Sequence, residues 1–307
     1  MTTYYVAKNG VNSGGGGSSS PWLTLNYAYG RISNGDTVRV RAGTYQEALT
    51  IAKTNVTFIA DDLSNRPVID GKYHVGLMNG AVGKSGVMPD PRGAAYLNLD
   101  GTKAIVSISG DGVAFEGFVI QNVAGDGIAI GGNNVTVRGN EVFFTYAMGI
   151  TSNPTSGAGI TGLLIENNVV RYASIMIFDP NRKQYYPGGD KQVVVGSIKV
   201  GNNGAGAVIR NNEVAYGFGE GINIGKYNYA TAANPFIVEG NFVHDCNHTG
   251  IYVNGSYHVI IRNNTVCSTN VELNLWDGDA PVGIKLFDEK KTLIRNITVY
   301  NLSLIHI

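Results

Sequence analysis

The sequence predicts an all-β fold: a single-stranded parallel β-helix, or solenoid, with a short N-terminal capping helix. Three observations predict it. A six-residue motif recurs five times, its closest copies are about one 22-residue coil apart, and 42 of the 307 residues are glycine. Repeats of this length are typical of folds in which each coil is stable only when it packs against its neighbours. Frequent glycine suits a chain that turns tightly several times in each coil.

The motif reads aliphatic, charged, Gly or Asn, Asn, any residue, Val. Phe118 and Ile297 take the Asn position in weaker copies at either end of the repeat. An asparagine at a tight bend tolerates left-handed backbone angles, and stacked asparagine side chains would hydrogen-bond along the axis of the solenoid. The five asparagines are Asn140, Asn168, Asn212, Asn241 and Asn264.

Each coil divides into three short strands. One strand precedes the motif asparagine, the second follows it, and the third has the form Gly-Ile-x-Ile, as in Gly221 to Ile224. Alternate side chains of a strand point to opposite faces, so the aliphatic residues point inside and the residue between them points outside. The outward residues, in chain order, are Ala129, Thr151, Lys199, Asn223, Tyr252 and Lys285.

The N-terminal segment 1–36 is expected to cap the first coil. Trp22, Leu25, Ala28 and Ile32 recur near helical spacing after Pro21, and proline is favoured as a first helical residue. The coils then begin at residue 37, so residues 1–301 form one domain, with the cap at 1–36 and the coils at 37–301.

The last six residues, 302–307, read Leu-Ser-Leu-Ile-His-Ile. A common transposon-adaptor DNA encodes this peptide in one frame. We therefore expect a non-native tail on a truncated C-terminus, in a gene fragment that came from shotgun sequencing. A β-helix cut in mid-coil would leave an open sheet edge.

Composition excludes several classes of protein. Lys plus Arg and Asp plus Glu are both 23, so the formal net charge is zero, which argues against a nucleic-acid partner. No apolar run approaches the ~18 residues of a membrane span. No basic region and apolar segment follow Met1, so no signal peptide is visible. The protein stays inside the cell, leaves it by a signal-free route, or lacks its true start here, so the localisation is open, with an extracellular or virion-associated protein as the leading hypothesis. Cys246 and Cys267 fall after the same strand of successive coils, as neighbouring thiols or a disulfide.

The N-terminal stretch also resembles a known family. Tyr4 to Gly10 and Gly35 to Tyr45 look like the first turns of right-handed parallel β-helix proteins of the pectate-lyase-like superfamily. The resemblance covers nearly the whole chain at the level of the fold. It implies a right-handed solenoid and an acidic polysaccharide as the partner, because many members bind or cleave such polymers, while others are phage tailspikes or surface proteins. No catalytic residue of the family matches a motif here, and fold alone does not set function.

The outward row defines the predicted functional site. Lys199, Asn223, Tyr252 and Lys285 should lie about 4.8 Å apart on adjacent strands and line a groove along the axis. Glu220 and His248 flank the row. The same row would also arise as a solvated strand face, so the pattern alone leaves both interpretations open.

A linear groove suits a linear polymer, and the chemistry of the row suits β-elimination from a uronic acid. Lys199 or Lys285 would neutralise the carboxylate or act as the base, and Asn223 would share the charge. His248 would take the proton and Tyr252 would assist the leaving oxygen. Candidate substrate-binding residues, which are aromatic or amide side chains near the groove, are Tyr185, Tyr186, Tyr227, Asn254 and Trp276.

Two alternatives remain open. The first is a non-catalytic β-helix module of a phage tail or cell-surface adhesin. The second is a glycoside hydrolase with paired carboxylates, at ~5–5.5 Å for retention or ~6.5–9.5 Å for inversion. Its candidate carboxylates are Glu220, Asp190, Asp277, Asp279 and Asp288.

No cofactor or metal ligand is assigned. Ca²⁺ is a possible ion for the loop that holds Asp277 and Asp279, because it prefers hard oxygen ligands, although a two-Asp loop is more often a simple turn. His244, Asp245 and His248 form the other group whose side chains are of the kind that ligate a metal.

Overall fold

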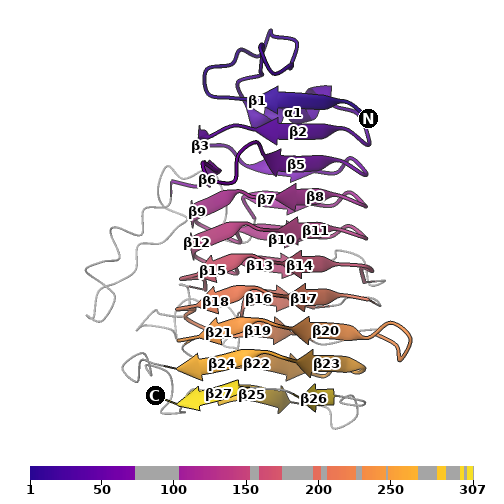
Figure 1. Cartoon of the computed structure of the whole chain (residues 1–307), viewed down its shortest axis with the longest axis vertical. Coiled ribbons are helices and arrows are strands. Elements are labelled where there is room, and N and C mark those ends of the chain that lie inside the picture. The colour runs from indigo at the N-terminus through magenta and orange to yellow at the C-terminus, as the bar shows by residue number, and fades with distance from the viewer. Residues whose placement is uncertain are drawn as a thin grey trace, which may run out of the picture.

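The structure is a computed structural model. It describes residues 1–72, 104–152, 159–174, 196–201, 206–225, 230–246, 248–268, 282–287, 298–300 and 303–306. Three parallel sheets run the length of a column, as Figure 1 shows. Strands from one coil pair with those of the next coil at the same position, so the chain forms the right-handed parallel β-helix that the repeat predicts.

Sheet A contains the strands before the motif asparagines. Its ten strands, in spatial order, are β1 (Thr3–Val6), β2 (Thr37–Val40), β5 (Thr57–Ala60), β8 (Ala114–Glu116), β11 (Thr136–Arg138), β14 (Leu164–Glu166), β17 (Val208–Arg210), β20 (Phe236–Glu239), β23 (Val259–Arg262) and β26 (Thr298–Tyr300).

Sheet B contains the strands after the motif asparagines. Its nine strands are β3 (Gly43–Tyr45), β6 (Pro67–Asp70), β9 (Val119–Val123), β12 (Glu141–Thr145), β15 (Val169–Arg171), β18 (Glu213–Ala215), β21 (Phe242–His244), β24 (Thr265–Ser268) and β27 (Ser303–His306).

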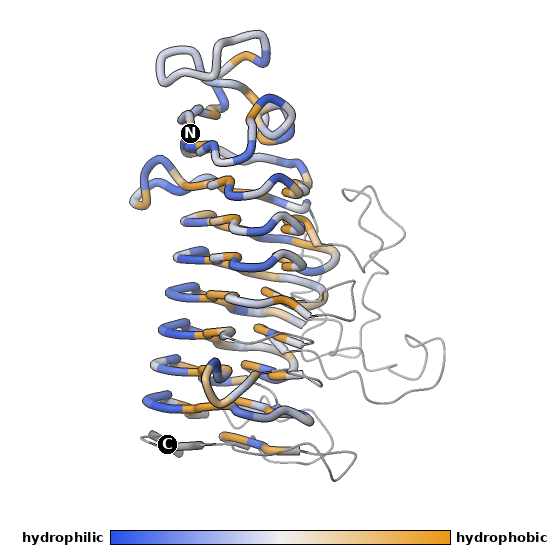
Figure 2. Tube along the Cα trace, turned by 90° about the vertical axis from the view of Figure 1, so that its right-hand side faces the viewer, coloured by the Kyte–Doolittle hydropathy of each residue, from blue (hydrophilic) through white to orange (hydrophobic). Residues whose placement is uncertain are grey.

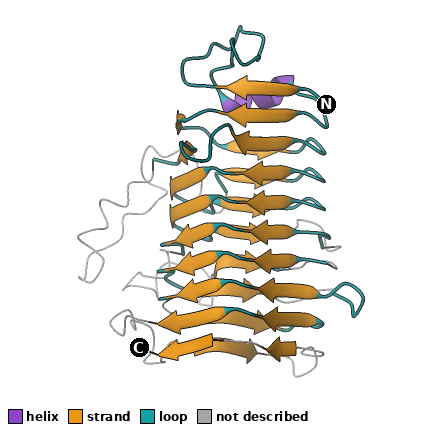
Figure 3. Ribbon diagram, viewed as in Figure 1, coloured by secondary structure: helices purple, strands orange, loops and turns teal. Residues whose placement is uncertain are grey.

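Sheet C contains the Gly-Ile-x-Ile strands and carries the candidate site. Its eight strands are β4 (Leu49–Ile51), β7 (Val106–Ile108), β10 (Ile128–Ile130), β13 (Ile150–Ser152), β16 (Gly196–Val200), β19 (Glu220–Ile224), β22 (Thr249–Asn254) and β25 (Val282–Phe287). Figure 3 shows the three sets of strands stacked in register.

Aliphatic side chains from all three sheets fill the interior. Ile222 and Ile224 of β19 are fully buried, as are Ile251 and Val253 beside them in β22. Figure 2 shows hydrophilic stretches recurring at the same edge of successive coils. A single coil cannot enclose a hydrophobic core of its own. Every coil therefore depends on its neighbours to bury its aliphatic side chains.

The glycine of the Gly-Ile-x-Ile strand has a packing reason. A Cβ built on Gly221 would lie 2.4 Å from Val243 Cγ1 and 2.5 Å from the carbonyl oxygen of Gly250. Any larger residue there would push sheet B away from sheet C and separate adjacent coils.

A helix covers the first end of the column, but it is shorter than predicted. Helix α1 spans Leu25–Arg31, and the Thr24 side chain accepts a hydrogen bond from the Tyr27 N–H as its N-cap. The expected start near Pro21 is wrong because Trp22 is extended. Its N–H donates to the Tyr5 carbonyl, and its own carbonyl accepts from Ala7.

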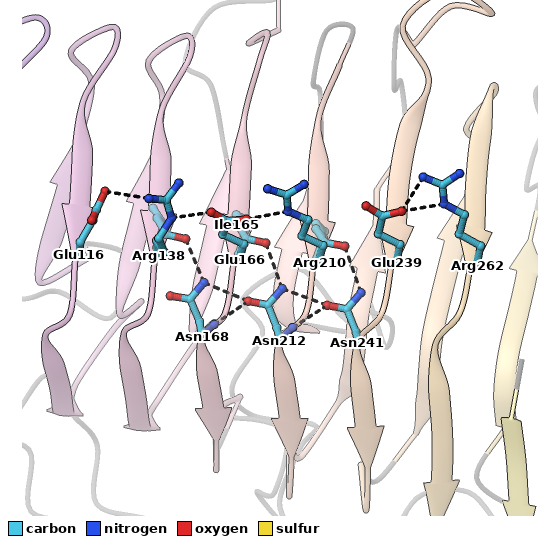
Figure 4. A network of polar contacts seen from close by, with 12 residues as sticks. Glu116, Arg138, Ile165, Glu166, Asn168, Arg210, Asn212, Glu239, Asn241 and Arg262 are labelled. Atoms are coloured by element: carbon cyan, nitrogen blue, oxygen red, sulfur yellow. Dashed lines mark hydrogen bonds and ion pairs between the residues drawn. The ribbon is translucent and has the colours of Figure 1, made fainter. Parts of the chain in front are cut away.

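The motif asparagines form the predicted ladder. Nδ2 of Asn212 donates to Oδ1 of Asn241 at 3.0 Å, and Oδ1 of Asn212 accepts from both the backbone N–H and Nδ2 of Asn168. Nδ2 of Asn212 also donates to the carbonyl of Ile165. Figure 4 shows three of these asparagines joined along the axis. Each amide is buried and joins one coil to the next.

Two details of the repeat differ from the prediction. The left-handed residue at the bend is the one before the ladder asparagine, such as Asn211 at φ 54° or Gly240 at φ 63°. This explains why the motif alternates Gly and Asn there. At the last coil, Val299 pairs with Ile261 and Ser303 with Thr265, so the bend of this coil falls between Tyr300 and Ser303, later in the chain than predicted. The origin of the segment 302–307 stays a prediction.

A charge ladder lies outside the asparagines on sheet A. Glu166 bonds Arg138 on one side and Arg210 on the other, and Arg262 bonds Glu239 further along (Figure 4). Burial acts to raise the pKa of Glu166, but the hydrogen bonds and charges of Arg210 and Arg138 outweigh it and hold the pKa below its usual range. The charged slot of the motif therefore pairs opposite charges between coils.

We expect Asn212→Ala to lower the free energy of unfolding by about 2–4 kcal/mol, because it leaves the buried Asn168 N–H and Ile165 carbonyl unpaired. Its matched control is Asn211→Gly, one residue earlier, which should change stability by no more than about 0.5 kcal/mol because other coils use glycine there. Urea denaturation of both variants measures the difference, and equal losses would contradict a structural role for the ladder.

Candidate functional site

The predicted outward row exists in the register of sheet C. Lys199 pairs with Asn223, Asn223 with Tyr252, and Tyr252 with Lys285. Thr151 precedes Lys199 in the same row. Four residues that lie up to 86 positions apart in the sequence therefore stand on four adjacent strands, about 4.8 Å from one to the next.

Exposure differs along the row. Lys199, Tyr252 and Lys285 are partly exposed, whereas Asn223 is buried. The neighbouring positions of the same strands also match the prediction, because Asn254 pairs with Phe287, and the backbones of Gly201 and Gly225 lie side by side. The row thus offers two cations and a phenol at the surface, with an amide set between them.

Glu220 lies behind the row and bonds directly to Asn223. Its carboxylate is fully buried, and Oε2 accepts a hydrogen bond from Asn223 Nδ2. Gly196 makes room for this pair, because a Cβ there would lie 2.8 Å from the Cβ of Asn223. The prediction included Glu220 among the catalytic residues. Its burial beneath Asn223 instead suits a group that acts through its neighbour.

His248 stands at the edge of the same cluster. Its Nδ1 lies 3.2 Å from Oγ1 of Thr249 and 3.9 Å from Oε1 of Glu220. The ring is partly exposed, so His248 connects the buried carboxylate to the surface of sheet C.

Asp126 is a second buried carboxylate that the sequence reasoning missed. It precedes Ala129 by three positions, as Glu220 precedes Asn223, and its Oδ1 accepts a hydrogen bond from the Met148 N–H at 2.9 Å. A signal was present in the sequence, since Asp126-Gly127-Ile128 repeats the acidic-Gly-Ile pattern of Glu220-Gly221-Ile222.

The pKa values of both carboxylates are raised toward neutrality. Burial raises the pKa of Glu220 to about 7, against the lowering effects of the Asn223 hydrogen bond and the charges of Lys199 and Lys285. Burial likewise raises the pKa of Asp126 to about 6, against the Met148 N–H and the charge of Lys199. Lys199 therefore interacts electrostatically with both acids, and shifted acids beside a surface row are typical of functional sites.

The predicted aromatic platforms Tyr185, Tyr186, Tyr227 and Trp276 lie outside the described residues, as do Asp190, Asp277, Asp279 and Asp288. An aromatic stack is present elsewhere, at the end of sheet B, where Phe144, Tyr172 and Tyr216 lie with ring centroids 5.0 and 5.2 Å apart. Each ring covers the face of the next, so this stack supports the bend and leaves little flat surface for a sugar.

Within the described ranges, no group of three or more His, Cys, Asp or Glu side chains is arranged to hold a metal ion. His244 and Asp245, whose Nδ1 and Oδ2 lie 2.9 Å apart, are therefore not part of such a group. Cys246 and Cys267 are free thiols, the first buried and the second partly exposed. Over the same described part of the chain, no helix has the length and apolar character needed to cross a membrane.

Comparison with known proteins agrees with this architecture. The family model described as "Right handed beta helix region" matches residues 100–299. The chain belongs to this family. No curated protein matches the sequence of this β-helix.

Solved structures resemble the β-helix over almost its full length. The pectate lyase Pel9A has a TM-score of 0.58 at 14% identity, with 98% of this chain and 78% of that chain covered. An alginate lyase from Paenibacillus sp. str. FPU-7 has a TM-score of 0.52 at 13% identity, covering 99% and 98%. A rhamnogalacturonan lyase has a TM-score of 0.51 at 13% identity, covering 99% and 88%. At these identities the likeness shows the shared fold.

The buried acids predict how stability depends on pH. The folded protein keeps the Glu220 proton up to a pH of about 7, whereas the unfolded chain releases it near 4.5. The stability from this group is therefore full below pH 4.5 and is lost as pH rises through 7, by up to about 3 kcal/mol. Glu220→Gln should remove this loss, so the variant gains stability relative to the wild type between pH 5 and 8.

Urea denaturation at several pH values measures this, with Glu166→Gln as the control of opposite sign. The pKa of Glu166 is lowered in the folded state, so its contribution is present above the unfolded pKa and lost as pH falls through the folded one. If Glu220→Gln and the wild type kept a constant difference from pH 5 to 8, the assignment of a buried proton to Glu220 would be wrong.

Proposed function

We propose that this β-helix binds an acidic polysaccharide along sheet C and cleaves it by β-elimination. The observation that carries the proposal is the row of Lys199, Asn223, Tyr252 and Lys285 on four adjacent strands, backed by the buried carboxylate of Glu220. A straight row of cations and polar groups is complementary to a straight polyanion.

The comparisons support the choice of substrate class. Three β-helices with similar folds are named as lyases, of pectate, alginate and rhamnogalacturonan. At identities of 13–14%, these three lyases support only the class of substrate, an acidic or uronic polymer. The choice of chemistry rests on the side chains of this chain.

The lysines and the proton carriers take separate roles in the proposal. Lys199 interacts electrostatically with two buried acids, Glu220 and Asp126, and belongs to the outward row that would face the polymer. An ammonium at this position suits neutralisation of the substrate carboxylate, because it places a positive charge beside an anion. Lys285, three strands along, would hold another carboxylate of the same polymer.

In the proposed reaction, His248 takes the proton from C5 of a uronic acid residue whose carboxylate is held by Lys199 and Asn223. The C4–O bond breaks, a double bond forms between C4 and C5, and Tyr252 gives its proton to the leaving oxygen. The proton on His248 and the missing proton on Tyr252 then exchange with solvent, so each residue returns to its starting state.

Paired-carboxylate hydrolysis finds less support in the described residues. Glu220 begins β19, whereas Asp126 lies two residues before β10, three steps away in sheet C. These strands are roughly 14 Å apart at ~4.8 Å per step, well beyond the ~9.5 Å that an inverting pair spans. The remaining candidate carboxylates lie outside the described ranges.

The test is a panel of uronic-acid polymers, with the ultraviolet absorbance of the new double bond and the number of reducing ends as readouts. We expect absorbance with at least one polymer, and we expect Lys199→Ala and Tyr252→Phe to lower kcat/KM by roughly 10²–10⁴-fold. Lys8→Ala is the matched control, because Lys8 lies over the Tyr45 ring near the N-terminal end of the column and should leave kcat/KM unchanged.

Each other outcome points to one of the alternatives. Reducing ends without absorbance would indicate hydrolysis, and binding without either product would indicate a non-catalytic module. If no polymer of the panel is bound or cut, the proposed substrate class is wrong.

A further inference from the structure

The amide of Asn223 is turned the wrong way for the role that the row gives it. Nδ2, the donor, points to Oε2 of Glu220. Among the described residues, the buried Oδ1 of Asn223 has no hydrogen-bond partner, and neither does Oε1 of Glu220. The end of the amide that is left without a partner is therefore an acceptor oxygen, although only the donor nitrogen can stabilise an anion.

We infer that the protonation state of Glu220 sets which atom of Asn223 faces the groove, and that a uronate binds with uptake of one proton. When Glu220 is ionised, it accepts from Nδ2, and Oδ1 is presented. When Glu220 is protonated, its O–H donates to Oδ1 after the amide turns by about half a rotation, and Nδ2 is presented to the substrate carboxylate. The inference about uronate rests on the proposed function, whereas the turn of the amide does not.

The surroundings of Glu220 make both states accessible. Lys199 of β16 and Lys285 of β25 favour the ionised form, His248 lies 3.9 Å away, and burial favours the protonated form. The balance places the pKa of Glu220 at about 7. The thiol of Cys246 also faces this part of β19, near Gly221, but burial raises its pKa to about 12, so it does not titrate in the same range.

The packing around Asn223 holds its Cβ and its backbone in place. Its Cβ lies against the Gly196 backbone, and Ile222 and Ile224 on either side point into the core. The side chain can therefore exchange its two ends without moving its backbone. On this basis Glu220 is a positioning residue, and Asn223 is the group that contacts the substrate.

The first experiment follows the Asn223 side-chain amide by NMR in the free protein labelled with ¹⁵N-asparagine, assigned by its loss in Asn223→Ala. We expect the amide signals to titrate with a midpoint near pH 7 in the wild type and to be independent of pH in Glu220→Gln, whose amide can donate to Oδ1 permanently. An amide that keeps one hydrogen-bonded state from pH 5 to 9 in the wild type would overturn the inference, even if the protein proves to be a lyase.

The second experiment measures binding of galacturonate and mannuronate trisaccharides by calorimetry in buffers of different ionisation enthalpy. The wild type should take up about one proton at pH 8, and its affinity should fall about tenfold per pH unit above 7. Glu220→Gln should keep its affinity at pH 8. Asn223→Ala should bind more weakly but without this pH dependence.

Asn223→Ala separates the amide turn from simple charge repulsion. If the ionised Glu220 merely repelled the substrate, the fall in affinity with pH would persist in Asn223→Ala, and the inference would fail. If the wild type binds neither trisaccharide at pH 6, the uronate part of the inference is wrong, while the amide titration still decides the turn itself.

Discussion

The register between coils is the constraint on which the whole structure depends. It is maintained where the buried amides of the asparagine ladder donate to one another, as from Asn212 to Asn241, and accept backbone N–H groups of the preceding coil. A slip of one residue would break every one of these bonds and would turn the aliphatic side chains outward. The same register brings Lys199, Asn223, Tyr252 and Lys285 into one row, so the ladder on one side of the column determines the geometry of the site on another.

Charge is handled differently on the two faces of the molecule. On sheet A, Glu166 lies between Arg138 and Arg210, and these two arginines of the adjacent coils hold its pKa below the usual range. On sheet C, burial raises the pKa of Glu220 to about 7 and that of Asp126 to about 6, because the hydrogen bonds from Asn223 and Met148 and the lysine charges only partly offset it. The contrast separates a face that stabilises the column from a face that can exchange protons.

Much of the fold was predictable because repetition amplifies weak signals. A single Gly-Ile-x-Ile strand is uninformative, but six of them with one register predicted both the aliphatic interior and the outward row. Single, non-repeated features were harder. The helix was expected to begin near Pro21, yet Trp22 pairs with β1 and Thr24 caps the helix, because a tertiary contact outweighs the local preference of proline. Asp126 was overlooked because one acidic residue before a glycine looks like an ordinary turn.

The sequence by itself determined the solenoid, the strands and which residues share a row, since these follow from the repeat period of the sequence. Only the tertiary structure decided that Glu220 is buried under Asn223, that its carboxylate takes the donor end of that amide, and that Asp126 belongs with it. The physical reason is that burial and hydrogen-bond direction depend on what the neighbouring coils place around a side chain, and the pattern of one coil does not contain that information.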